Sequence, residues 1–227
     1  APDSPTILQS LFELKLYQGE YADAIKYSEK IIVLDPANKE IGLELFQLYI
    51  QEGNKDDAHE LLDNLTKYYS SDIDILYARA NLQHSNQDWS NLLKTYHSIY
   101  LFDKDNYEIL IRIYEIGLAT GYESIILEIF QKILIENKIP MVMELVVKLV
   151  SGMKEYSEAI YYIHKLMEID GSTDQRIINL GELYLLNNQF DHVITTLEPI
   201  YDQGNHSLEV LRLLMIAYSS SGKSTEQ

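Results

Sequence analysis

Residues 16–27 read Leu-Tyr-Gln-Gly-Glu-Tyr-Ala-Asp-Ala-Ile-Lys-Tyr, with a glycine at position 19. The place of this glycine recurs along the chain at Gly53, Gln87, Gly121, Lys154, Asn188 and Gly222. The successive steps are 34, 34, 34, 33, 34 and 34 residues. A fixed period of this length is typical of proteins in which one short piece of secondary structure is stacked many times.

Each period contains two helical stretches and a short turn, as residues 5–38 show. Apolar residues recur at helical spacing from Ile7 to Leu14, and Gly19 then permits the tight turn that antiparallel helices need. A second helix is predicted over residues 21–34, with Ala24 on its buried side. It ends before Pro36, because proline disfavours the helical conformation in the residue that precedes it.

These residues resemble the tetratricopeptide repeat family. The resemblance rests on residues 16–27, on the Leu34-Asp35-Pro36 that follows, and on the residues in the place of Ala24, which are Ala58, Leu92, Ile126, Ala159 and Val193. It implies an all-α fold, an α-solenoid in which antiparallel helix pairs form a right-handed superhelix. A single array over residues 1–227 is expected, with repeats at about 5–38, 39–72, 73–106, 107–139, 140–173 and 174–207 and a partial repeat at 208–227.

The match is weaker in the third and fourth repeats, where Gln87 takes the glycine place and bulky Leu92 and Ile126 take the alanine place. In the sixth repeat, Pro199 lies within the predicted second helix. Two outcomes are open there: the proline bends a continuous helix by removing one backbone hydrogen bond, or the helix ends before it.

The charge of the chain restricts its partners. The 227 residues include 35 acidic and 18 basic residues, which give a formal net charge of −17. Such a field repels nucleic-acid phosphates and anionic lipid head groups, and it favours basic or neutral partners. No stretch approaches 18 uncharged apolar residues, so we expect no direct membrane insertion.

No pattern in the sequence predicts catalysis, a cofactor or a metal ion. The chain has no cysteine, and no two of its six histidines lie three or four residues apart, so no helix presents a pair of imidazole ligands. It also lacks a glycine-rich phosphate loop and a Gly-x-Ser-x-Gly turn. We therefore expect a protein that is not an enzyme.

Both ends of the sequence suggest a piece of a longer chain. Pro2 stands 34 residues before Pro36, as if it closed an upstream repeat, and residues 208–227 hold only a first helix. A stack of repeats needs polar caps, so we expect exposed apolar surface around Leu211, Leu214 and Met215. Self-association through such uncapped ends is one predicted consequence.

The resemblance implies that the first helix of each repeat lines the inner wall of the array, where partners bind. In this register, acidic residues outnumber basic ones and an apolar residue recurs in most repeats. The candidate partner-binding residues are Glu13, Glu40, Leu43, Gln47, Tyr77, Asn81, Glu108, Ile111, Arg112, Glu115, Glu144, Lys148, Ile178 and Glu182.

The predicted function is a non-catalytic scaffold that binds a protein or peptide in an acidic and apolar groove. The expected partner is net basic or amphipathic. One alternative is an architectural or self-associating helical arm of a larger protein whose catalytic or membrane-anchored domain lies outside this segment. A second alternative is a lytic or transferase enzyme whose active domain lies beyond the ends.

Overall fold

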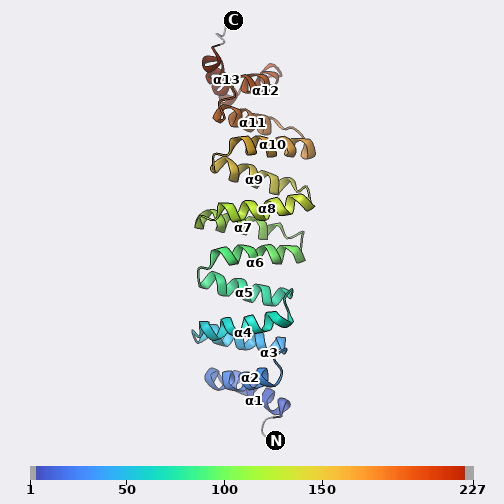
Figure 1. Cartoon of the computed structure of the whole chain (residues 1–227), viewed down its shortest axis with the longest axis vertical. Helices are drawn as coiled ribbons and strands as arrows, with labels where there is room; N and C mark the ends of the chain where they lie inside the picture. The colour runs from blue at the N-terminus through green and yellow to red at the C-terminus, as the bar shows by residue number, and fades with distance from the viewer. Residues whose placement is uncertain (1–3, 223–227) are drawn as a thin grey trace. The chain divides into compact units, whose positions relative to one another are not determined.

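The computed structural model describes residues 4–222, which form thirteen α-helices and no β-strand (Figure 1). The odd-numbered helices are α1 (Pro5–Gln18), α3 (Lys39–Gln51), α5 (Ile73–Ser85), α7 (Tyr107–Thr120), α9 (Pro140–Gly152), α11 (Asp174–Leu186) and α13 (Leu208–Ser221). The even-numbered helices are α2 (Tyr21–Leu34), α4 (Lys55–Tyr68), α6 (Trp89–Phe102), α8 (Glu123–Glu136), α10 (Tyr156–Asp170) and α12 (Phe190–Asp202). The all-α prediction is confirmed, whereas Pro2 and its predicted turn lie outside the described residues.

The helix starts follow from residues that recur with the repeat period. The side chains of four residues just before odd-numbered helices accept a hydrogen bond from the backbone N–H three residues later, and so satisfy a donor that has no partner within the helix. These capping residues are Asn38, Asp72, Thr173 and Ser207. Helices α1 and α9 instead begin with Pro5 and Pro140, a residue that suits the first helical position.

All seven recurring turn positions adopt a left-handed backbone conformation. The glycines at 19, 53, 121 and 222 have φ between 71° and 79°. Gln87, Lys154 and Asn188 adopt the same conformation, with φ of 57°, 64° and 57°. The period therefore located the turns correctly even where glycine is missing, and Gln87 and Lys154 hold a conformation that costs an L-residue about 1–2 kcal/mol.

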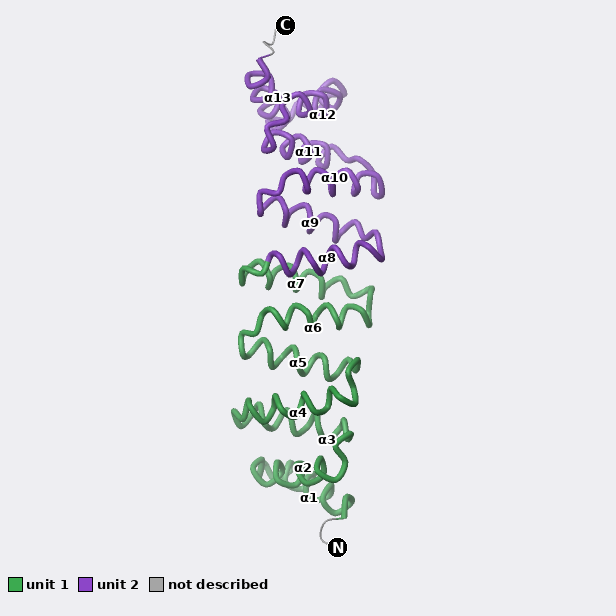
Figure 2. The backbone as a smooth tube through the Cα atoms, viewed as in Figure 1, with its two compact units in different colours: residues 1–122 green, residues 123–227 purple. Residues whose placement is uncertain are grey.

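The helices fall into two compact units, residues 4–122 and residues 123–222 of the described chain (Figure 2). In unit 1, each of α1 to α6 packs against the next helix in the chain, and α3 also contacts α5. In unit 2, α8 to α13 pack in the same sequential manner, and α11 also contacts α13. Within each unit, helices thus bury their apolar faces against near neighbours in sequence; a single array over both units stays a prediction.

The interior of unit 1 is built from residues that are almost fully buried, such as Leu8, Phe12, Ala24 and Leu65. Leu92, the bulky residue in the alanine place, is also completely buried. A glycine allows one especially close helix contact, because a Cβ at residue 42 would lie 2.8 Å from Cδ1 of Leu65. Different repeats therefore reach close packing with different small and large residues.

The helix that contains Pro199 is continuous. Helix α12 runs on to Asp202, three residues beyond the proline. The reading in which this helix ends before Pro199 is therefore wrong.

Three tyrosines link consecutive repeats in the same way. Each lies four residues before a turn position, and its hydroxyl meets a side chain twenty residues earlier, on the second helix of the preceding repeat. The pairs are Tyr49 with Glu29 at 2.8 Å, Tyr184 with His164 at 2.9 Å, and Tyr218 with Glu198. Burial first, and then the bond to Glu29, raises the pKa of Tyr49 above its usual value of 10.0.

We predict that Tyr49→Phe lowers the free energy of unfolding by about 1 kcal/mol at pH 7, because it removes the hydrogen bond to Glu29. The folded-state pKa of Tyr49 is raised, so this contribution is complete below pH 10.0 and declines as the pH rises further. Urea denaturation of both proteins between pH 7 and pH 11 measures the difference. Tyr17→Phe is the matched control, since Tyr17 is 91% exposed; equal losses in the two variants would refute the link.

We also predict that Gln87→Gly and Lys154→Gly each raise the free energy of unfolding by roughly 0.5–1 kcal/mol. Glycine relieves the left-handed strain, and its larger freedom in the unfolded chain offsets part of the gain. Chemical denaturation measures the effect. Gln51→Gly, at the end of helix α3, is the control and gives no gain; an equal gain there, or none at 87 and 154, contradicts the prediction.

Candidate functional site

The first-helix wall, defined here as the exposed faces of the odd-numbered helices, carries most of the predicted partner-binding residues. Eleven of the fourteen are exposed: Glu13, Glu40, Gln47, Tyr77, Asn81, Glu108, Ile111, Arg112, Glu115, Glu144 and Lys148. Leu43 and Glu182 are half-buried, and Ile178 is only 5% exposed. Since α11 packs against α13 as well as α10 and α12, Ile178 belongs to the interior of unit 2 and offers no surface to a partner.

Four of the predicted residues meet at one hollow in unit 1. Tyr77 and Asn81 reach it from α5, and Glu108 and Arg112 reach it from α7. Tyr96 of α6 also lines the hollow, whose volume is about 170 Å³. Residues about 30 positions apart in the sequence therefore contribute to one local site, and they do so because the helices of consecutive repeats are neighbours.

The charges at this hollow are partly balanced. The Arg112 guanidinium donates to Oε1 of Glu108 at 2.9 Å, one turn away on the same helix. This bond to Glu108, more than its contact with Tyr96, raises the pKa of Arg112. Tyr77 is 42% exposed, so the site combines an accessible aromatic residue with an ion pair and the amide of Asn81.

A region of unpaired acidic charge lies on the first two odd-numbered helices. Burial first, and then the charges of Glu40 and Glu13, raises the pKa of Glu44 on α3. Glu44 was absent from the predicted set, although it follows Glu40 by four residues and so shares its helix face. Glu40 and Glu13 therefore both oppose the ionisation of Glu44, although burial has the larger effect.

Other carboxylates of the wall are engaged by basic residues of neighbouring repeats. Lys39 donates to Asp72 at 2.8 Å and to Asp74 at 2.9 Å, and so joins the starts of α3 and α5. In unit 2, Arg176 donates to Glu144 at 2.8 Å. Arg212 also lies 3.7 Å from Glu182. In unit 2, therefore, basic side chains offset part of the negative charge that a count of acidic residues on the wall predicts.

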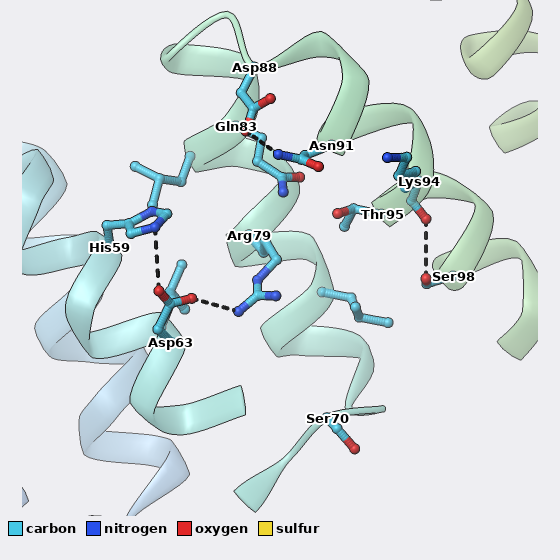
Figure 3. A pocket seen from close by; sticks show the side chains of 13 residues that line it. His59, Asp63, Ser70, Arg79, Gln83, Asp88, Asn91, Lys94, Thr95 and Ser98 are labelled. Atoms are coloured by element: carbon cyan, nitrogen blue, oxygen red, sulfur yellow. Dashed lines mark hydrogen bonds and ion pairs between the residues drawn. The ribbon is translucent and has the colours of Figure 1, made fainter. Parts of the chain in front are cut away.

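A second hollow in unit 1 lies between α4, α5 and α6 and has a volume of about 440 Å³ (Figure 3). Its polar lining includes Asp63 from α4, Arg79 and Gln83 from α5, and Asn91 and Lys94 from α6. None of these residues was predicted to bind a partner. The sequence could have indicated this hollow through Gln83. This residue lies four residues before a turn position, where three other repeats have a linking tyrosine.

Unit 2 contains a more apolar hollow of about 540 Å³ between α8, α9 and α10. Ile135 and Tyr161 line it, and Ile135 is 84% exposed. Lys138 and Lys165 also lie at this hollow, and Lys165 is paired with Glu168 at 2.9 Å. The prediction missed this hollow because it considered first helices only, and two of these helices are second helices of their repeats.

Helix α13 departs in part from the prediction of an exposed apolar end. Met215 is largely exposed and Leu211 is half-buried, but Leu214 is buried. Leu214 therefore packs inside unit 2, where α13 contacts α11 and α12. Self-association through this region stays a prediction.

Residues 4–222 lack two further features. None of the helices there is both long enough and apolar enough to span a membrane. That part of the chain also holds no group of three or more histidine, aspartate or glutamate side chains placed to share a metal ion.

Comparisons with known proteins agree with this architecture. The model of the tetratricopeptide repeat family matches residues 15–82. A chain from the structure of Naa15/Naa10 bound to HypK-THB superimposes with a TM-score of 0.64 at 10% identity, over 96% of this chain and 35% of that one. This likeness is one of fold.

Two other solved structures are similar at lower scores. The MamA protein has a TM-score of 0.47 at 18% identity, over 74% of this chain and 92% of its own. A tetratricopeptide repeat protein from Parabacteroides merdae ATCC 43184 has a TM-score of 0.47 at 14% identity, over 96% of this chain and 87% of its own. No curated protein matched the sequence in the comparison.

The family model covers the stretch in which the period is clearest, and helices of the same spacing continue on both sides of it. Residues 15–82 therefore match the tetratricopeptide repeat family, and the described chain as a whole shares the fold of the Naa15/Naa10 chain.

Proposed function

We propose that this protein is a non-catalytic scaffold that binds a protein or peptide segment on the first-helix wall of unit 1. The observation that carries the proposal is the hollow at which Tyr77, Asn81, Glu108 and Arg112 converge. A volume of about 170 Å³ is smaller than the roughly 300–1,000 Å³ of small-molecule pockets, and it suits a single side chain of a longer ligand.

The groups around the hollow suit an extended peptide. The exposed ring of Tyr77 can pack against an apolar or cationic side chain. The amide of Asn81 can both donate and accept hydrogen bonds, as a peptide backbone requires. An aromatic anchor beside adaptable polar groups is the usual composition of a binding hot spot.

The charge of unit 1 favours a basic ligand. Glu13, Glu40 and Glu44 lie close together on α1 and α3, and nothing in the described contacts neutralises Glu40 or Glu44 with a basic side chain. A ligand that places lysine or arginine there would relieve the mutual repulsion of these carboxylates. The similar chain from the Naa15/Naa10 structure comes from a protein complex, which supports use of the fold as a scaffold.

The test is selection of random twelve-residue peptides displayed on phage against the whole chain at low salt. We predict that the selected peptides contain more lysine and arginine than aspartate and glutamate. Their affinity is expected to fall about tenfold or more with Tyr77→Ala or Asn81→Ala, since loss of a hot-spot contact costs at least about 1–2 kcal/mol. It is also expected to fall with added salt.

Tyr68→Ala is the matched control, because Tyr68 is 56% exposed but lies on α4, outside the wall. The control variant binds the selected peptides as well as the unmodified protein does. Acidic peptides, or peptides that bind both wall variants with full affinity, would rule out the proposed site.

A further inference from the structure

The hollow between α4, α5 and α6 lies beside Gln83, which stands in the place of the three linking tyrosines. Gln83 lies 34 residues after Tyr49, and Asp63 lies 34 residues after Glu29, so this pair is the repeat equivalent of a tyrosine–glutamate link. No hydrogen bond joins Gln83 and Asp63; Asp63 instead accepts from Arg79 at 3.1 Å. The hollow of about 440 Å³ lies beside this pair, as a hollow of about 380 Å³ lies beside Tyr49 and Glu29 in the preceding repeat.

Gln83 leaves a polar atom without a partner in this hollow. Its Oε1 atom is buried and accepts no hydrogen bond from any described residue. A buried acceptor without a donor costs about 1–3 kcal/mol. A group that enters the hollow and donates to Gln83 would recover this free energy, so the side chain is poised for a polar ligand.

The charges around the hollow balance one another. Asp63 and Asp88 contribute two carboxylates, and Arg79 and Lys94 contribute two cations. Figure 3 shows Asp63 between His59 and Arg79, and Asn91 donating to Asp88 at 2.8 Å. A strongly charged ligand would meet a like charge here, whereas an uncharged group with both a donor and an acceptor would not.

We propose that this hollow binds the carboxamide side chain of an asparagine or glutamine in a partner protein. A carboxamide donates through its NH₂ group to Gln83 and accepts through its oxygen from the donors around it. The volume also leaves room for part of the partner's backbone beside the side chain.

This site is separate from the one on the first-helix wall. Both use helix α5, but Tyr77 and Asn81 lie on one side of it and Arg79 and Gln83 on the other, since successive helix residues are about 100° apart. The two sites can therefore be tested independently.

The experiment is an NMR titration of the whole chain with N-acetyl-glutamine methylamide at millimolar concentrations. We expect saturable shifts in the Gln83 side-chain amide and in backbone amides of residues 59–98. N-acetyl-glutamate methylamide, of nearly the same shape but charged, is expected to shift these signals at least tenfold less at the same concentration.

Two variants test whether the Gln83 amide is required. Gln83→Met keeps the side-chain length but removes the amide, and Gln83→Tyr replaces the amide with the residue found at this place in the preceding repeat. Both are expected to abolish the shifts while circular dichroism stays unchanged. Gln51→Met is the matched control and retains them, as does Tyr77→Ala on the wall. Equal shifts with the glutamate compound, or shifts that survive Gln83→Met, would overturn the proposal.

Discussion

The structure depends on apolar surface that no helix pair can bury alone. Each pair consists of two helices of 13 to 15 residues, a length at which isolated helices are marginal in water. Fully buried residues such as Phe12, Leu65 and Leu92 contribute about 1.5–3 kcal/mol each only because the next helix covers them. The caps, turns and tyrosine links all serve to keep consecutive helices in the register that this covering requires.

Much of the fold could be predicted because its signals are local. The period located every turn, including those at Gln87 and Lys154, and proline or a capping residue marks where several helices begin. Local rules could not decide whether the helix continues past Pro199, because α12 packs against α11 and α13 and stays continuous. These contacts outweigh the local preference of proline against a helix interior.

The candidate sites were less predictable because they depend on which face of a helix its neighbours cover. Ile178 lay in a register position expected to face a partner, but packing of α13 against α11 encloses that helix more completely. Glu44 shares a face with Glu40 and was overlooked, and the carboxylate of Glu144 is neutralised by an arginine 32 residues away. Ion pairs between neighbouring helices, such as that between Arg176 and Glu144, therefore decide which carboxylates of the wall remain uncompensated.

The most direct test of shared burial is hydrogen exchange on the chain with Leu65→Ala in helix α4, with Lys67→Ala as an exposed control on the same helix. Leu65 is fully buried, and such a truncation costs about 2–5 kcal/mol. If neighbouring helices share one interior, amide protection falls most in α3, α4 and α5 and stays unchanged in α11 to α13. A loss confined to α4, or an equal loss in all thirteen described helices, would contradict the account.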